Sequence, residues 1–484
     1  MADASFLKSR SAVAIALVGL FTGRSAAQTK PNVNGVTQND QDVPNLNRVN
    51  QDELASFYGR MNVVVGSGAR AFGMGGAFLA RADDATAASW NPAGLSYLRR
   101  TEVSLVGVQN DFSQTTTLSG NATTGARNGD QLVDRLQGSV TDFVGAALPY
   151  RLNGRAGAVQ VSYQRSFSFS GKRRSEGPGA IRGFANDRNV FPTEFTVEGD
   201  GGFDTISVSS GFEVNPRARI GVSINRWVDG FTQTVTRQSD VQNPNDFRDI
   251  RSKWDISGTN FNFGILVTPT EKLNVGAVIK TPFTARLGLA KDRTDPDPSN
   301  SSLRISNRSE GDVSIRFPRV YGLGVSYRVT NTLTFSADFT RTAWSKSTIT
   351  NFFTLGKPDS GSGANTIDRF GALPFPAVEN DTQADANQVR AGGEWVIRSG
   401  SSGGLLFPIR AGFFRDGQPF LADGRSPSFT GLTAGAGVTI GGLLFDVAFI
   451  REIGNVPVTG QAEPRKVRYN RLFASMIVRF GERR

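Results

Sequence analysis

Any chemistry in this chain has to come from carboxylates, guanidinium groups, amines, hydroxyls and aromatic rings. The 484 residues include no histidine and no cysteine. Those two absences exclude Ser-His-Asp and Cys-His nucleophilic sites, acid–base catalysis by histidine, structural zinc and disulfide bonds. We therefore predict no catalytic site, no metal site and no cofactor. The residue types that remain are suited to binding a ligand.

Five charged residues fall on the inward face of predicted strands: Asp338, Arg390, Glu394, Arg410 and Asp446. Two roles fit them. They can neutralise one another as ion pairs inside a wet interior, or one cation can hold the carboxylate of a ligand by a bidentate hydrogen bond. Arg390 and Arg410 are the candidates for that second role.

A glycine-rich segment, 66–95, contains a second set of candidates. The patterns Gly66-x-Gly68 and Gly73-x-Gly75-Gly76 have the spacing of a phosphate-binding loop. They lack the lysine and hydroxyl pair of such a loop, and no parallel βαβ pattern follows, so nucleotide binding is disfavoured. Gly73, Gly75 and Gly76 are instead candidate hinges, because glycine rearranges at little steric cost.

Small residues dominate the rest of this segment, so its backbone can pack closely against other backbone. Asp83-Asp84 followed by Ala85–Ser89 predicts a short capped helix, and Asn91-Pro92 ends it. We expect a compact segment that folds inside a larger structure as a plug. Its apolar side chains either line a ligand pocket or pack the plug itself: Phe72, Met74, Phe78, Leu79 and Trp90.

The elements that position these residues are β-strands. In 157–169, Val159, Val161 and Tyr163 alternate with polar residues, and the same period of two recurs along the chain. Each strand therefore has one apolar and one polar face. The predicted strands number about fourteen, with 312–329 treated as one strand across Pro318: 102–112, 136–150, 155–170, 203–214, 218–229, 253–268, 271–283, 312–329, 331–344, 387–397, 405–415, 428–440, 442–452 and 467–480.

Short and long connections alternate between these strands. Short ones contain turn residues, as in Leu152-Asn153-Gly154, and the longer ones, such as 230–252 and 345–386, are polar. Short turns on one side and long loops on the other are typical of outer-membrane barrels. A soluble β-sandwich or propeller, the alternative, predicts no such alternation. The sequence therefore predicts an all-β fold, a transmembrane antiparallel β-barrel of about 14 strands with an N-terminal lumenal plug.

The N-terminus predicts export. Lys8 and Arg10 precede the apolar run 12–21, and Ser25-Ala26-Ala27 offers a cleavage site, which is the pattern of a signal peptide. Ten apolar residues span only ~15 Å as a helix, about half a bilayer core, so a retained transmembrane helix is the weaker interpretation. The predicted parts are a signal peptide at 1–27, a tether and plug at 28–98, and the barrel at 99–484.

The charge of the chain does not favour a nucleic-acid partner. Lys and Arg number 54 against 43 Asp and Glu, a net charge of +11, and the mean hydropathy is −0.26. The basic residues are scattered without a run of five, which is the distribution of a solvated surface. The expected partners are outer-membrane lipid, a hydrophobic small molecule and the barrel assembly machinery.

Aromatic residues at strand ends predict girdles at the two membrane interfaces. They are Tyr150, Trp227, Trp254, Tyr321, Tyr327, Trp344 and Trp395. The final predicted strand also ends in an aromatic residue, Phe480, as an assembly signal would, although Gly481-Glu482-Arg483-Arg484 follow it.

The segment Gly73–Leu95, with ADDATAASWNPAGL at its core, resembles the N-terminal hatch of the FadL/TodX family of outer-membrane transport proteins. Further similarity lies in Phe317-Pro318 before Tyr321–Tyr327, in Asp338-Phe339-Thr340 before Trp344-Ser345, in Arg390–Glu394 and in Arg410–Phe413. These come in the family's order and span most of the mature chain. The resemblance assigns the hatch motif to Asn91, Pro92 and Ala93, together with Asp83, Asp84 and Gly94, and leaves the ligand contacts unassigned.

This resemblance implies a channel in the bacterial outer membrane for passive uptake of hydrophobic small molecules, such as long-chain fatty acids or aromatic hydrocarbons. We expect passage by rearrangement of the plug, and a ligand that is apolar with at most one anionic end. A related branch with a similar motif serves protein secretion, so an anchor or sorting component for secretion or surface assembly is the alternative. An enzyme is not expected, because the outer-membrane enzymes resemble one another in using a catalytic histidine.

Overall fold

The computed structural model describes residues 66–117, 131–176, 194–238, 247–297, 300–350, 384–399, 405–422, 424–457 and 463–481. All of them belong to one compact unit, Asn45–Arg484. The predicted signal peptide and most of the predicted tether lie outside the described residues.

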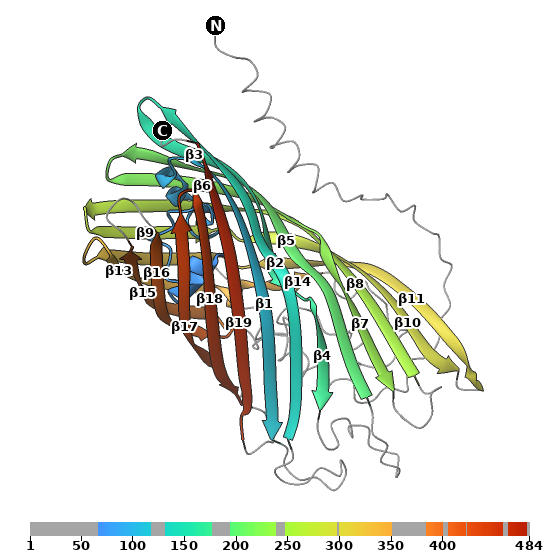
Figure 1. Ribbon diagram of the computed structural model, residues 1–484. Helices are drawn as coiled ribbons and strands as arrows, with labels where there is room; N and C mark the ends of the chain where they lie inside the picture. The colour runs from blue at the N-terminus through green and yellow to red at the C-terminus, as the bar shows by residue number, and fades with distance from the viewer. Residues whose placement is uncertain are drawn as a thin grey trace. The chain divides into compact units, whose positions relative to one another are not determined.

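Antiparallel strands make up most of this unit (Figure 1). The strand segments are β1 Thr101–Thr117, β2 Gln131–Leu152, β3 Arg155–Ser168, β4 Gly171–Glu176, β5 Glu194–Asn215, β6 Ala218–Val228, β7 Gly230–Gln238, β8 Phe247–Thr270, β9 Leu273–Lys280, β10 Phe283–Asp297, β11 Asn300–Phe317, β12 Val320–Arg328, β13 Leu333–Thr342, β14 Thr348–Thr350, β15 Ala386–Arg398, β16 Leu406–Gly417, β17 Ser428–Ile440, β18 Leu443–Val456 and β19 Arg465–Phe480.

These segments form a closed barrel of fourteen strands. Five pairs of segments are single barrel strands with a short break: β3 with β4, β6 with β7, β9 with β10, β11 with β12, and β13 with β14. Nineteen segments less five breaks leave fourteen strands. The first strand, β1, pairs with both β2 and the last strand, β19, which closes the barrel. The predicted fold class is confirmed.

The breaks have local causes. Pro318 lies between β11 and β12, where it cannot donate a ladder hydrogen bond because it has no N–H. Asp229, between β6 and β7, has a φ of 69°. The 3₁₀-helix η2, Trp344–Lys346, separates β13 from β14. The predicted strand across Pro318 is therefore one strand of the barrel, with a break in its hydrogen bonding at Pro318.

The short turn between β2 and β3 has the predicted chemistry. Asn153 and Gly154 have φ values of 51° and 76°, the left-handed pair that a two-residue hairpin turn requires. β2 ends at Leu152 and β3 begins at Arg155, so the turn sits where the sequence placed it. Much of the predicted long connections lies outside the described residues.

Strand β18 shows how the wall divides the inside from the outside. Phe445 and Phe449 point outward and are 44% and 46% exposed, whereas Asp446 and Ala448 point inward and are buried. Side chains alternate in this way because successive residues of a strand face opposite sides. The outward apolar face is the one that meets lipid in a membrane barrel.

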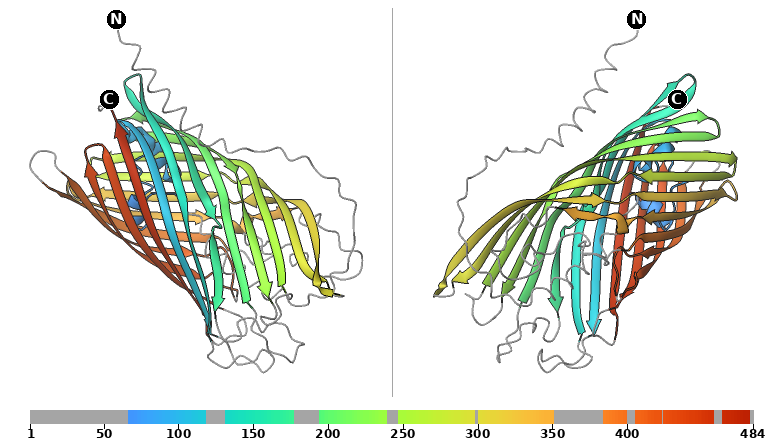
Figure 2. Two further views of the ribbon diagram at one scale, coloured as in Figure 1. Left: turned by 45° about the vertical axis from the view of Figure 1, so that its right-hand side comes forward. Right: turned by 180° about the vertical axis from the view of Figure 1, so that it is seen from behind.

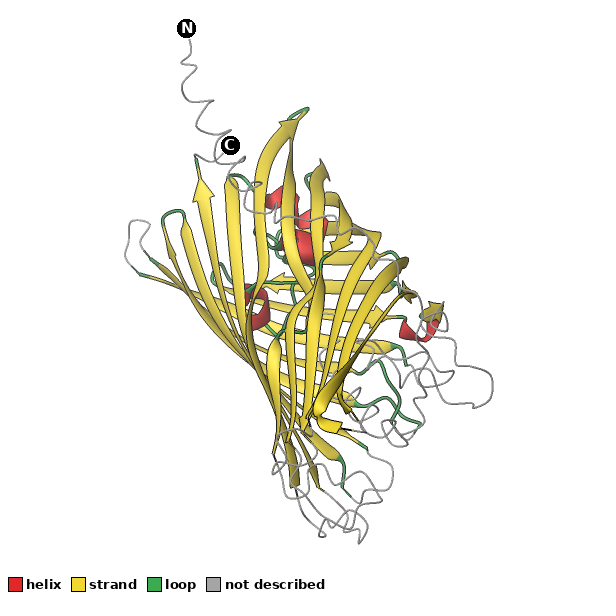
Figure 3. Ribbon diagram, turned by 90° about the vertical axis from the view of Figure 1, so that its right-hand side faces the viewer, coloured by secondary structure: helices red, strands yellow, loops and turns green. Residues whose placement is uncertain are grey.

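Three short helices lie inside the barrel (Figures 2 and 3): α3 Ala69–Gly73, α4 Ala87–Trp90 and the 3₁₀-helix η1 Pro92–Tyr97. We call residues 66–98 the hatch. Helix η1 packs against β3, β5, β6 and β8, and α3 packs against β16, β17, β18 and β19. Among the described residues, no helix is long and apolar enough to cross a membrane.

The helix predicted over 85–89 is shorter than expected. It begins at Ala87 and has four residues, ending at Trp90 before Asn91 as predicted. The expected acidic cap is displaced, because the Asp84 carboxylate accepts hydrogen bonds from the amide (2.9 Å) and hydroxyl (2.6 Å) of Thr86. The carboxylate shapes the turn that precedes the helix.

The girdle prediction is wrong for three tryptophans. Trp227, Trp254 and Trp344 are 9%, 1% and 2% exposed and pack inside the barrel. The reason is strand parity: Trp227 shares the inward face of β6 with Asn225. Position at a strand end does not decide which way a side chain points. Tyr321, Tyr327 and Trp395 do face outward.

Candidate functional site

The asparagine of the predicted hatch motif fastens the hatch to itself and to the wall. Asn91 donates through Nδ2 to the carbonyl oxygens of Leu79 (3.0 Å) and Ile265 (3.1 Å). Its Oδ1 accepts from the Ala93 amide (3.2 Å), and Pro92 begins η1. One buried side chain therefore holds a hatch loop, a helix start and strand β8 together.

The remaining motif residues shape the hatch. A Cβ at Gly94 would lie 1.7 Å from the carbonyl oxygen of Ala82, so only glycine fits there. Arg70 donates through Nη1 to Asp83 (2.6 Å) and Asp84 (3.1 Å). These ion pairs join α3 to the loop before α4, so the two acidic residues hold the hatch in its compact form.

The candidate hinge glycines lie against the wall. Gly75 and Gly76 have φ values of 70° and 76°, a region that glycine adopts without strain. Thr433 on β17 accepts from the Gly75 amide and donates to the Gly73 carbonyl, both at 2.9 Å. The structure therefore gives these residues a role in close contact, and their role as hinges stays a prediction.

Glycines of the wall form a seat for the hatch. A Cβ at any of them would come between 2.0 and 2.9 Å from a hatch atom. They come from eight barrel strands, and we call them the glycine seat: Gly211, Gly221, Gly264, Gly276, Gly322, Gly324, Gly392, Gly412 and Gly435. The hatch backbone therefore lies directly on wall backbone over much of the circumference.

The five apolar hatch residues pack the hatch. Each exposes 2% or less of its surface: Phe72, Met74, Phe78, Leu79 and Trp90. The Phe72 ring stacks on Phe473 of the wall at 4.3 Å between centroids, and Trp90 meets Phe72 edge-on at 5.6 Å. In the structure these side chains pack the hatch, and their role in lining a ligand pocket stays a prediction.

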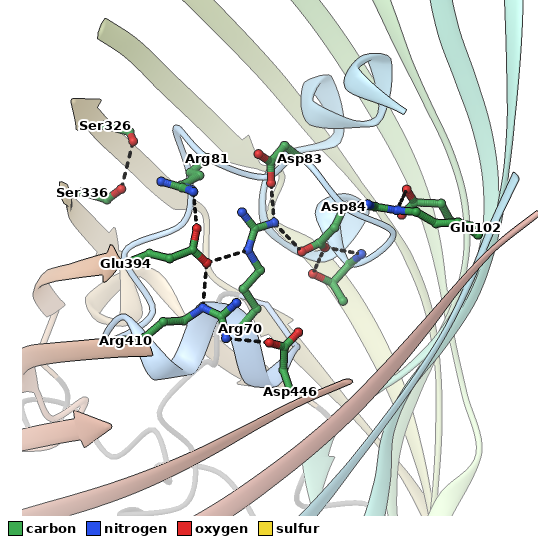
Figure 4. Close-up of polar contacts among 12 residues, drawn as sticks. Arg70, Arg81, Asp83, Asp84, Glu102, Ser326, Ser336, Glu394, Arg410 and Asp446 are labelled. Carbon is green, nitrogen blue, oxygen red and sulfur yellow. Dashed lines mark hydrogen bonds and ion pairs between the residues drawn. The ribbon is translucent and has the colours of Figure 1, made fainter. Parts of the chain in front are cut away.

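An ion cluster joins the hatch to the wall (Figure 4). Glu394 on β15 accepts from Nε of Arg410 (2.7 Å) and from Nε of Arg70 (3.2 Å), and it also pairs with Arg81. Arg410 in turn donates to Asp446 at 2.6 Å. The Glu394 and Arg410 side chains are only 4% and 2% exposed, so water screens these charges weakly.

The arginines proposed for a ligand carboxylate are engaged elsewhere. Arg410 pairs with Glu394 and Asp446. Arg390 donates to Asp416 (2.6 Å) and to the Gly75 carbonyl (3.0 Å). Both arginines are buried. Four of the five inward charges therefore form ion pairs in the structure, and a role for Arg390 or Arg410 in holding a ligand carboxylate stays a prediction.

Among the described residues, Asp338 is the one predicted inward charge that forms no ion pair. Its Oδ2 accepts from the backbone amides of Phe78 (2.7 Å) and Leu79 (2.8 Å). A wall carboxylate therefore satisfies two amides of the hatch that no helix pairs. This contact adds a further fastening on the side of β13.

A cavity of about 80 Å³ lies beside the hatch. One side is apolar, and the other is polar with a single lysine. Its lining consists of Gln164, Ser166, Phe167, Thr205, Asn225, Trp227, Asn260, Asn262, Lys280, Thr281, Phe283, Phe317, Pro318, Val320, Thr342 and Trp344. None of the ligand-binding candidates from the sequence is among these residues.

Aromatic rings cover the apolar side of the cavity. Phe283 and Phe317 stack at 4.8 Å between centroids with planes 5° apart, and Trp227 stacks on Phe283 at 5.1 Å. The Trp227 indole donates to Asn260 Oδ1 at 2.9 Å, which ties the rings to the polar side. Two of the tryptophans predicted for a membrane girdle, Trp227 and Trp344, thus line this site.

Lys280 is the cation of the cavity. It lies at the end of β9, and its Nζ donates to the carbonyl of Ser89 in the hatch (3.4 Å). The neighbouring Ile279 points outward and is 45% exposed, so Lys280 points inward by parity. A lysine in an inward position of an alternating strand is the sequence signal that would have found it.

The wall is interrupted close to the cavity. β2 pairs with β3 as far as Phe143↔Gln164 and with β4 from Gln137↔Lys172. The five β2 residues between them, 138–142, have no partner in either ladder. The cavity residues Ser166 and Phe167 belong to the part of β3 that faces this gap in the ladder.

Residues 55–362 match the sequence family described as outer membrane protein transport protein (OMPP1/FadL/TodX). No curated protein matches the chain. A FadL homologue from Pseudomonas aeruginosa is similar in structure, with a TM-score of 0.56 and 16% identity over 86% of this chain and 99% of that one. The monoaromatic hydrocarbon channel CymD gives 0.54 and 15% over 87% and 100% of the two chains. The toluene transporter TbuX of Ralstonia pickettii gives 0.53 and 16% over 87% and 100%.

Proposed function

Because this chain belongs to the FadL/TodX family of outer-membrane transport proteins, we propose that it takes up small hydrophobic compounds with an aromatic body and at most one anionic group. The family transports hydrophobic compounds in the outer membrane and is not a family of enzymes. The alternative role, an anchor for secretion or surface assembly, is not favoured by this match. Two proteins of similar structure are a monoaromatic hydrocarbon channel and a toluene transporter, and their ligands belong to the aromatic class proposed here.

The composition of the cavity supports this class of ligand. Stacked rings of Trp227, Phe283 and Phe317 offer apolar faces, on which each buried CH₂ of a ligand gains about 0.8 kcal/mol. Aromatic pairs gain a further contribution of about 0.5–1.5 kcal/mol from offset or edge geometry. Lys280 supplies one positive charge on the opposite side, which suits one carboxylate.

The small size of the cavity supports a passage mechanism in which part of the structure moves. An engineered cavity of about 150 Å³ holds benzene, so about 80 Å³ is too small for a whole aromatic ligand. Some boundary must therefore move for passage. We propose that the hatch moves, with Gly73, Gly75 and Gly76 as hinges, because the hatch touches the cavity through the Ser89–Lys280 contact.

Uptake by cells that lack their own transporter tests the proposed ligand class. Labelled aromatic hydrocarbon, aromatic carboxylate and long-chain fatty acid are compared in cells with this chain and with an empty vector. We expect faster entry of both aromatic compounds. If only the fatty acid enters faster, the aromatic class is wrong, and if no compound does, the transport proposal fails.

An engineered disulfide bond between hatch and wall tests the proposed movement. The chain has no native cysteine, so no other thiol competes for the new bond. Ser67 of the hatch donates to Asp142 of β2, so the pair Ser67→Cys and Asp142→Cys places one thiol on each side of the boundary. Ser326→Cys with Ser336→Cys is the control, because these hydroxyls lie 3.0 Å apart on two wall strands. Oxidation should stop uptake only in the first variant, and a reductant should restore it. Unchanged uptake in the locked variant would mean that the hatch stays fixed.

A further inference from the structure

Strands β16 to β19 are neighbours in the wall (Figure 1). Their inward face carries both acidic and basic residues, whereas the exposed charges of their outward face are of one sign. Their three acidic residues, Asp416, Asp446 and Glu452, all point inward and are buried. The exposed charged residues on their outward faces are all basic: Arg415, Arg451, Lys466 and Arg468. We call these four residues the outward basic patch.

The patch lies at one edge of the apolar band. Arg415 follows Phe413 by two residues, and Arg451 follows Phe449 by two, so each pair shares the outward face of its strand. Both phenylalanines are exposed, at 44% and 46%. Beyond the arginines the chain enters the longer connections, which are extracellular in barrels of this kind. The patch is therefore at the level of the outer-leaflet headgroups.

The register of the strands brings the patch together. Arg415 pairs with Thr430, Thr430 pairs with Ile453, and Ile453 pairs with Arg468. Arg415 and Arg468 thus end one row across four strands, about 14 Å apart by three strand spacings. Arg451 lies two residues from Ile453 on the same face, inside that span. The register therefore places the three arginines on the outward face of neighbouring strands, within the spacing of four strands.

Among the residues that the structure describes, the three arginines of the patch, Arg415, Arg451 and Arg468, form no ion pair. Lys466 lies 4.0 Å from Glu463, and both are more than half exposed. The patch accounts for part of the chain's surplus of basic residues, which transport of a small apolar compound does not require.

We propose that the outward basic patch binds the phosphate groups of lipopolysaccharide in the outer leaflet. Guanidinium groups bind phosphate through paired, charge-assisted hydrogen bonds. The exposed band directly below, which includes Leu432 (64%) and Phe449, gives the acyl chains of the same molecule an apolar surface. This continuity selects a lipid over free phosphate. The inference depends on the outer-membrane location and not on the ligand proposed for the cavity.

Native mass spectrometry of the full chain in detergent tests the proposal. Bisphosphorylated lipid A and its dephosphorylated form are offered in equal amounts to the wild-type protein and to the variant Arg415→Gln/Arg451→Gln/Arg468→Gln. The wild type should retain the phosphorylated form preferentially. Loss of three exposed charge contacts should lower that retention by about tenfold or more. Inorganic phosphate should compete only weakly.

A matched control removes the same charge from the opposite end of the barrel. The variant Arg217→Gln/Arg328→Gln/Arg398→Gln changes three exposed arginines next to the short turns and should retain lipid A like the wild type. Replacing the patch arginines by lysine should restore part of the retention. Equal retention by wild type and patch variant overturns the proposal. So does a wild-type protein that retains both lipid forms equally, a result that needs no variant to fold.

Discussion

Replacing Glu394 by glutamine should release the hatch while the barrel remains assembled. Glu394 belongs to wall strand β15 and accepts from two hatch arginines, Arg70 and Arg81, as well as from Arg410. Arg410 keeps Asp446, and Arg70 keeps its acidic partners in the hatch. Arg81, 14% exposed, keeps no carboxylate partner among the described residues. The substitution therefore weakens the contact between hatch and wall more than the wall itself.

The burial of Glu394 and its arginine partners sets the size of the change in the free energy of hatch opening. Breaking a buried ion pair by removing one partner costs about 3–5 kcal/mol. The lower end applies here, because Arg410 and Arg70 keep other partners and glutamine still accepts a hydrogen bond. A loss of about 3 kcal/mol in the free energy of hatch opening raises the open population roughly a hundredfold, at 1.4 kcal/mol per factor of ten.

A single cysteine in the hatch reports this population. Ala88→Cys places a thiol at a position that is 4% exposed, and the rate of its labelling by a membrane-impermeant maleimide follows hatch opening. Glu452→Gln is the control, because Glu452 is equally buried and pairs with Arg471 of the wall at 3.0 Å. Labelling should accelerate about a hundredfold with Glu394→Gln and little with Glu452→Gln. Equal rates in the two variants would refute the assignment of Glu394 to the hatch.

Three further substitutions test the site. Lys280→Met should abolish uptake of an aromatic carboxylate and leave uptake of an aromatic hydrocarbon, as measured with labelled compounds. Phe283→Ala removes a ring that stacks on both Trp227 and Phe317, so it should enlarge the cavity and raise the uptake rate of bulkier aromatic compounds. Gly94→Ala should cost about 1–3 kcal/mol or more by overpacking and make the hatch sensitive to protease. Gly107→Ala, whose Cβ would have no neighbour nearer than 3.9 Å, should not.

The barrel could be predicted because its signal is local. The predicted strands 428–440 and 442–452 correspond to β17 and β18 within a few residues, since alternation of period two is visible inside each strand. The resemblance to the hatch of the FadL/TodX family also singles out Asn91 and Gly94. Their contacts within the hatch span 12 residues, from Ala82 and Leu79, and a compact segment keeps such contacts close in sequence.

The cavity could not be predicted, because it depends on registers between strands. Trp227 meets Asn260 only because β6 and β8 pair with a particular offset, and alternation within either strand does not fix that offset. The pairing of Arg390 with Asp416 depends in the same way on the register of β15 against β16. The direction of the three inward tryptophans has a local signal, because parity within each strand is visible in the sequence. Position at a strand end carries no information on direction.

The glycine seat has a consequence for the order of assembly. Strand segments that carry Gly221, Gly264 or Gly392 on their inward face have no side chain there to pack across the lumen. Those segments gain interior contacts only when the hatch is present, so they are the least restrained part of a barrel without it. We expect the hatch to act as an internal template, so that strands close around it. In this order of assembly the hatch is in place when the barrel closes, so no barrel with an empty lumen forms in the membrane.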